Sequence, residues 1–180
     1  MKSDVLIGAG KSTGMFFTAP AGTALPAYPG ETLGASWAEV GDISEDGISL
    51  KLPSGDVLRN WALQPKRKIN TENGAVSGAI METTKKVLET LFGSDNVNHV
   101  AATAQHGNVD SVELSPDVSA EEAAYLFLIK DGDSLVMIGS SNALITEIAD
   151  VSFNGTSAVV YDTTIEGTWT YMIDDGAVVS

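Results

Sequence analysis

The sequence predicts a mainly β protein with one helix, folded as a single domain. Segments of alternating apolar and polar residues recur along the chain, and turn sequences separate two pairs of apolar runs. Only one segment clearly repeats its apolar residues at helical spacing. The 180 residues suffice for one domain with a substantial core. A hydrophobic content of 43% is that of a globular fold and not of a disordered chain.

Strands are predicted where apolar side chains alternate with polar ones or form short runs. In residues 47–52, three apolar side chains alternate with polar ones, as expected for a strand with one buried face. The same criteria predict strands over residues 15–20, 74–83 and 168–173.

Two hairpins are predicted from the turn residues between strands. In residues 124–139, Asp131-Gly132 separates two apolar runs, and an Asp-Gly pair suits a turn that needs positive φ. A second hairpin is predicted over residues 143–165, with Asn154-Gly155 as its turn. Residues 139–141, between the two, are predicted as a loop.

One helix is predicted over about residues 83–92. Thr83 or Thr84 can cap its start, and Gly93 stands where a left-handed residue ends a helix. A capping box in residues 119–124 gives a weaker signal, because it runs directly into β-rich sequence. The apolar side chains that share one face of the predicted helix are Val87, Leu88, Leu91 and Phe92.

The net charge of −14 is concentrated in the second half of the chain. Residues 1–86 carry nine basic and nine acidic groups, whereas residues 87–180 carry one basic and fifteen acidic groups. Such a surface repels phosphate backbones, so sequence-specific nucleic-acid binding is not expected. The charge suits solubility, and it also suits a channel through which DNA slides without sticking.

No catalytic, cofactor or metal site is predicted, so the chain is not expected to be an enzyme. Residues 5–14 resemble a phosphate-binding loop, but Val5 replaces the glycine that opens the phosphate cradle. No serine-hydrolase elbow or dinucleotide fingerprint occurs, and there is no cysteine. Asp131 and Asp133 are interpreted as turn residues, and His99 and His106 as ordinary surface or core residues.

Two segments are predicted to make contacts between subunits: a flexible N-terminal arm at residues 1–14 and a long loop at residues 53–73. Long loops in compact domains are usually functional or disordered, and Trp61 is a candidate contact anchor. The sequence has no signal-peptide pattern or bilayer-spanning apolar run, so we expect folding in a cytoplasm and no membrane partner. The candidate contact residues are Gly8, Gly10 and Gly14 in the arm and Arg59, Trp61, Lys66, Arg67 and Lys68 in the loop.

The order of several sequence fragments resembles the major tail (tail tube) proteins of bacteriophages with long, non-contractile tails. In the second half the resemblance lies in a hairpin followed by Thr146, Glu147, Ala149–Phe153, Gly155, Ala158, Val159 and Tyr161. In the first half it lies in residues 16–27 and in Trp37, Gly41 and a turn over Ile43–Gly47 before a strand. Residues 80–93 are similar to the strand-to-helix junction of the family.

The resemblance implies a β-sandwich or barrel-like core with one flanking helix. It implies hexameric rings that stack into a hollow tube, in which the arm and the loop bridge subunits. The implied partners are other copies of the chain, the tape-measure protein, the tail terminator and initiator proteins, and phage DNA that passes without sequence-specific binding. The implied location is the virion tail, assembled in the bacterial host cytoplasm.

Two alternatives remain open at the level of sequence. One is a tube protein of a related contractile or secretion apparatus. The other is a carbohydrate- or receptor-binding β-sandwich module, which would expose aromatic platforms. The tryptophans Trp37, Trp61 and Trp169 are the candidates for such platforms, although Trp37 and Trp169 stand in strand-like sequence that suggests core positions.

Overall fold

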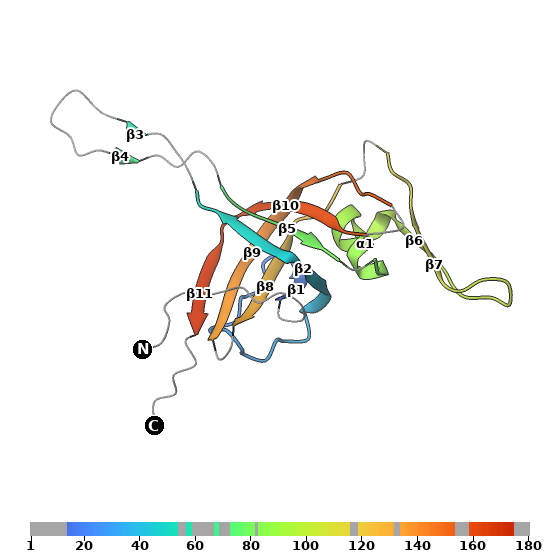
Figure 1. Ribbon diagram of the computed structural model, residues 1–180, viewed down its shortest axis with the longest axis horizontal. Coiled ribbons are helices and arrows are strands. Elements are labelled where there is room, and N and C mark those ends of the chain that lie inside the picture. Colours follow the sequence, from blue (N-terminus) through green and yellow to red (C-terminus); the bar gives the residue numbers. More distant parts are fainter. Residues whose placement is uncertain are drawn as a thin grey trace.

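A computed structural model describes residues 14–53, 57–58, 67–68, 73–81, 83–115, 119–131, 134–153 and 159–174 (Figure 1). The main strands are β1 (Gly14–Pro20), β2 (Ala38–Lys51), β5 (Gly74–Ile80), β8 (Ala123–Asp131), β9 (Ser134–Ile148), β10 (Tyr161–Gly167) and β11 (Thr170–Asp174). Two short pairs lie outside the main sheet: β3 (Val57–Leu58) with β4 (Arg67–Lys68), and β6 (Val97–Val100) with β7 (Val109–Val112). The helices are α1 (Lys85–Phe92) and the 3-10 turn η1 (Ser94–Asn96).

The main sheet closes on itself. Its strand order is β10-β5-β2-β1-β8-β9-β11, and β10 also pairs with β9, so every strand except β11 belongs to a closed antiparallel barrel. β10 pairs with the half of β9 from Ala143 to Ile148, and β11 continues along the half from Leu135 to Gly139. The predicted mainly β fold with a barrel-like core and one flanking helix is confirmed.

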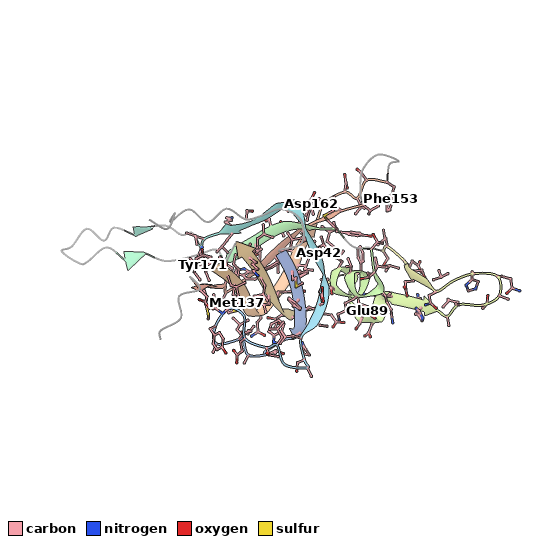
Figure 2. The ribbon with its side chains drawn as sticks, turned by 60° about the horizontal axis from the view of Figure 1, so that its bottom comes forward. Asp42, Glu89, Met137, Phe153, Asp162 and Tyr171 are labelled. Carbon is pink, nitrogen blue, oxygen red and sulfur yellow. The ribbon has the colours of Figure 1, made fainter. Side chains whose placement is uncertain are left out.

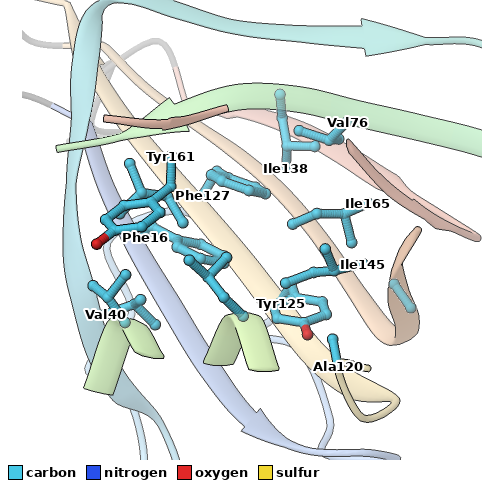
Figure 3. Packing of buried hydrophobic residues seen from close by; sticks show 14 of the residues in the cluster. Phe16, Val40, Val76, Ala120, Tyr125, Phe127, Ile138, Ile145, Tyr161 and Ile165 are labelled. Atoms are coloured by element: carbon cyan, nitrogen blue, oxygen red, sulfur yellow. The ribbon is translucent and has the colours of Figure 1, made fainter. Parts of the chain in front are cut away.

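The barrel is filled by an apolar cluster built around three stacked aromatic rings (Figure 3). The Phe16 ring stacks on Phe127, with centroids 4.6 Å apart, and on Tyr125, with centroids 5.7 Å apart. Side chains along β10 point alternately into and out of the barrel. Tyr161 and Ile165 are buried inside, while Asp162 and Glu166 are exposed outside. Period-2 patterning therefore assigns the two faces of this strand.

The outer face of β8 and β9 is also buried, because residues 21–37 cover part of it. A side chain added at Gly139 would lie 2.8 Å from Leu25 of this segment, and the Gly22 N–H donates to the Ser141 carbonyl at 2.8 Å. Leu126 and Met137 are fully buried. Burial of both faces explains why β8 is an unbroken apolar run instead of an alternating strand.

The start of strand β2 differs from the sequence prediction. The strand begins at Ala38, not at residue 47, and pairs with β1 before it reaches β5. The predicted turn at residues 43–47 is an irregularity inside the strand: Ile43 faces Ile80, and Ile48 faces Gly78. Gly47 has φ +74°, which suits a backbone that must bulge.

The loop predicted at residues 139–141 was wrong, because β9 runs through these residues. These residues lie within the strand, where Ser140 is buried and its hydroxyl donates to the Asn142 carbonyl at 2.9 Å. The β8–β9 register shifts between Ala123 and Tyr125, so the strand bends without leaving the sheet. The loop prediction failed because small polar residues at a register shift resemble a turn in sequence.

Both predicted hairpins form, with different connections. The last β8–β9 pair is Asp131 with Ser134, so the connection is residues 132–133, one position later than predicted. In the second hairpin, Thr163 pairs with Ile148, and β10 begins only at Tyr161. Its predicted turn, Asn154-Gly155, lies outside the described residues.

The predicted helix is confirmed as α1. Thr84 caps its start, accepting a hydrogen bond from the Val87 N–H at 3.3 Å. At its end, Gly93 has φ +84° and its N–H donates to the Glu89 carbonyl at 3.0 Å. Val87 and Leu91 are fully buried in the core, so α1 packs against the barrel. The weaker helix signal at residues 119–124 was wrong, because residues 119–122 are not helical and β8 begins at Ala123.

Candidate functional site

The structure describes three of the eight predicted contact residues. Arg67 and Lys68 form β4, where their backbones pair with Leu58 and Val57 of β3. Gly14 is the first residue of β1 and pairs with Ile129, so the last residue of the predicted arm belongs to the barrel. Gly8, Gly10, Arg59, Trp61 and Lys66 lie outside the described residues, so their roles stay predictions.

The outer surface formed by three neighbouring strands of the barrel carries only negative charge, and Lys51 of β2 lies at its border, paired with Ala75. Strands β5, β9, β10 and β11 contain no lysine or arginine. Asp162 is exposed on β10, at the outside of the barrel (Figure 2). Glu166 is exposed on the same strand, and Glu147 of β9 pairs with Thr164 between them. The outer faces of β5, β10 and the Ala143–Ile148 half of β9 are called the acidic face below. Sequence reasoning found the acidic excess but not the face that carries it.

Small side chains make the acidic face shallow. Ala79, Ser77 and Ala75 of β5 pair with Asp162, Thr164 and Glu166 of β10, in that order. The hydroxyls of Ser77 and Thr164 are hydrogen-bonded at 3.2 Å. A hollow of about 340 Å³ lies here, and Gly47 and Ala149 also line it. The face therefore combines negative charge with short, mutually bonded side chains.

A second acidic region lies beside α1. A cavity of about 320 Å³ is lined by Lys86, Glu89, Glu121, Glu122 and Tyr125, together with small side chains of β1 and neighbouring loops. Glu89 is paired with both helix lysines, at 3.2 Å from the Lys85 ammonium and 4.0 Å from that of Lys86. This region is called the α1 cavity below.

The two described tryptophans do not form an exposed platform. Trp169 is half-buried and packs on the core, with its ring centroid 6.0 Å from that of Phe127. Trp37 is half-buried and lines a cavity of about 240 Å³ under residues 23–36. The position of Trp169 agrees with the predicted core position, whereas Trp37 lies outside the core cluster. Trp61 lies outside the described residues.

The two histidines lie on the surface, on and next to the β6–β7 hairpin. The His99 Nδ1 atom lies 2.7 Å from the Asp110 carboxylate, and the His106 Nδ1 atom lies 2.6 Å from the Gly107 carbonyl. Within the described ranges, no three histidine or acidic residues gather closely enough to hold a metal ion. In the same ranges, no helix has the length and apolar character needed to cross a bilayer.

Comparison with known protein families gives a match that covers most of the chain. A family model described as "Phage tail tube protein" matches residues 2–168. No curated protein sequence matches. The matched region includes the whole barrel, α1 and both outlying hairpins. The match agrees with the closed β fold and with the fragments that suggested the same family from sequence. The chain therefore belongs to the phage tail tube protein family, as a structural component of the virion tail.

Proposed function

We propose that this tail tube protein polymerises as stacked hexameric rings, and that the resulting hollow tube conducts phage DNA at ejection. During assembly in the host cytoplasm the tube surrounds the tape-measure protein. The terminator protein and the initiator protein bind at its two ends. The role is structural and assigns no catalysis to the chain. Membership of the tail tube family supports a tube, and the acidic face supports the passage of DNA.

The acidic face is the observation that carries the DNA-conduit part of the proposal. A duplex is a dense line of negative charge, so basic side chains along a channel would hold it by releasing counterions. Within its three strands the acidic face offers carboxylates, hydroxyls and aliphatic groups to a passing phosphate backbone, and the nearest cation is Lys51 at its border. We therefore assign the acidic face to the inner wall of the tube, where repulsion keeps DNA mobile.

The segments outside the barrel supply the contacts between copies. A ring is a heterologous interface closed by rotation, and stacked rings can extend without limit. Ordering a bridging segment costs about 1–2 kcal/mol per residue of backbone entropy, which opposes nucleation until a template ring is present. Residues 1–13 and 53–73 are assigned to this role, and the glycines of the arm keep it flexible before assembly.

Negative-stain electron microscopy of the concentrated protein tests the assembly proposal. We expect rings or hollow tubes of the wild type, and their loss in a variant that lacks residues 53–73. Tubes that persist without residues 53–73 would refute the role of that segment. A uniform field of small particles in both proteins, with the chain also absent from purified virions, would refute the tube itself.

The acidic face is tested by reversing its charge. Asp162→Lys with Glu166→Lys should leave folding intact, because both side chains are exposed, and should make purified tubes retain short duplex DNA. The control matched in charge is Glu39→Lys with Asp42→Lys, two exposed residues of β2 that pair with Phe17 and Met15 of β1. Equal DNA retention by both variants would contradict the assignment of the acidic face to the inner wall.

A further inference from the structure

Strand β11 carries the core face of the sheet beyond its cover. Tyr171 and Ile173 pair with Ile138 and Val136 of β9, and paired residues of an antiparallel sheet lie on the same face. The two β9 residues are buried in the core, whereas Tyr171 and Ile173 are 51% and 50% exposed. Two large side chains therefore lie half in solvent, and Figure 2 shows Tyr171 on the opposite side of the barrel from Glu89 of α1.

The backbone of β11 is unpaired along one edge. Among the described residues β11 pairs only with β9, and the other strands of the main sheet each have two neighbours there. An open edge that exposes apolar side chains invites pairing, and natural proteins usually shorten, charge or cover such an edge. β11 is short, but it contains no lysine, arginine or proline. These features favour a cover over this edge.

A buried donor next to β11 lacks a partner. Trp169 directly precedes the strand and packs on the core, and its Nε1 atom is enclosed without a hydrogen-bond partner in the described part of the chain. Enclosed N–H groups without a partner are uncommon in folded proteins and call for an explanation. This end of the barrel therefore lacks an acceptor as well as an apolar cover.

The residues that precede β1 can reach this edge. Gly14, Ile129, Val136 and Ile173 are paired in one row across β1, β8, β9 and β11. Four strand spacings of about 4.8 Å, or about 19 Å in all, separate Gly14 from the open side of β11. Seven residue steps of about 3.3 Å span about 23 Å, so Ile7 can lie beside Ile173.

The sequence of the arm matches the strand that it can reach. In the register set by Ile7 and Ile173, the apolar run Val5–Ile7 lies beside the apolar run Tyr171–Ile173. Valine and isoleucine favour strands, and their side chains pair well with aromatic and β-branched neighbours. Two glycines lie within the three residues after the run, where the chain has to turn away from the edge.

Charge and polarity agree with this pairing. Lys2 and Lys11 flank the run, whereas β9, β10 and β11 contain acidic residues and no lysine or arginine. Opposite charges on the two segments favour their contact. In the same register Ser3 comes level with Trp169, and serine can supply an oxygen acceptor for an indole N–H.

We propose that residues 3–7 pair, as an additional strand, with the open edge of β11 in their own chain before assembly. The connection through Gly14 keeps the arm at a high local concentration at this edge, which favours its own chain over a second copy. The new edge carries Lys2 and Asp4, and charged residues of this kind block further pairing. The arm must leave β11 before it can bridge copies, and this consequence rests on the proposed function.

Engineered cysteine pairs test the pairing directly, because the chain has no cysteine of its own. Val5→Cys with Tyr171→Cys should form a disulfide within one molecule when the dilute, unassembled protein is mildly oxidised. Val5→Cys with Val100→Cys is the matched control, because Val100 is 50% exposed on β6, on the α1 side of the barrel (Figure 1). The control pair should stay reduced, since a disulfide needs its two Cβ atoms within about 4.5 Å. Equal oxidation of the two proteins, or a disulfide between two molecules of the first, would overturn pairing within the chain.

Hydrogen exchange tests the same pairing without added cysteines. Val5→Asp with Ile7→Asp places two charges against the apolar face of β11. The amides on the open edge of β11 should then exchange at least about tenfold faster than in the wild type. Ala9→Asp with Ser12→Asp adds the same two charges to the connecting residues and should leave the exchange unchanged. Equal exchange in the wild type and the first variant would contradict a covered edge.

Both measurements use the unassembled protein, so they separate this inference from the proposed function. If the cross-link fails to form and the wild type assembles, the pairing is wrong and the tube stands. If the cross-link forms and the wild type makes neither rings nor tubes, alone or in virions, the pairing stands and the tube falls. The oxidised protein with Val5→Cys and Tyr171→Cys should form tubes only after reduction. Equal tube formation before and after reduction would refute release of the arm as a step of assembly.

Discussion

Replacing Phe16 with leucine measures what the stacked aromatic rings contribute to the barrel. Phe16 is fully buried and stacks on both Phe127 and Tyr125. A phenylalanine-to-leucine change largely conserves apolar volume, so the main loss is two ring pairs, each contributing about 0.5–1.5 kcal/mol beyond burial. We expect a destabilisation of about 2 kcal/mol, which lowers the melting temperature of a chain of this size by about 4–8 °C.

The neighbouring residue gives the control. Phe17 is half-buried on the outer face of β1 and forms no ring pair with the described residues. Phe17→Leu should therefore cost less than about 1 kcal/mol, and shift the melting temperature by no more than about 2–4 °C. Thermal unfolding followed by circular dichroism measures both. Equal shifts for the two variants would show that ring stacking adds nothing to this core.

Three further changes test α1 and the assembly segments. Thr84→Ala should lower the melting temperature by about 2–4 °C, because it removes a cap of about 1 kcal/mol, whereas Thr84→Ser should not. Lys66→Glu with Arg67→Glu should weaken tube formation if the basic loop contacts the acidic surface of a neighbouring copy, and moderate salt should weaken assembly of the wild type for the same reason. Assembly that does not depend on salt would count against this contact. Gly8→Ala with Gly10→Ala should cause spontaneous polymerisation or spoil assembly by stiffening the arm, and an unchanged light-scattering profile would contradict that role.

The elements that the sequence predicted correctly are those whose signals are local. Thr84 and Gly93 mark the two ends of α1 within the helix itself, and both have the predicted capping roles. The β8–β9 hairpin follows from an Asp-Gly pair between apolar runs, although the connection lies one residue later. Signals of this kind need no knowledge of the rest of the chain, because the few residues involved determine the local backbone.

The elements that the sequence missed depend on distant partners. The first part of β2 is polar and glycine-containing, and it becomes a strand because β1 pairs with it, as in the Met15–Asp42 pair. Residues 21–37, which cover part of the outer face of β8 and β9, are rich in proline and glycine. Only Leu25 and a few other apolar residues in this segment indicate from sequence that it packs on the sheet. Long-range pairing of this type overrides local propensity.

The two candidate surfaces differ in the same way. The acidic face has a sequence signal, because Asp162, Thr164 and Glu166 alternate with buried residues of β10, and period-2 reading places them together. The α1 cavity has none, since Glu89 and Tyr125 meet there only because α1 packs against the barrel.

Closure of the barrel restricts how copies of the chain can join. An open sheet presents unpaired backbone groups at both edges and invites uncontrolled pairing between molecules. In the main sheet, only β11 leaves an edge unpaired among the described residues, and this strand is five residues long. Extended edge-to-edge growth through the barrel is therefore blocked. Under the proposed ring assembly, we therefore expect copies to join through side-chain contacts and through the segments outside the barrel. An ordering cost of about 1–2 kcal/mol per residue in those segments would then delay growth until a template ring is present.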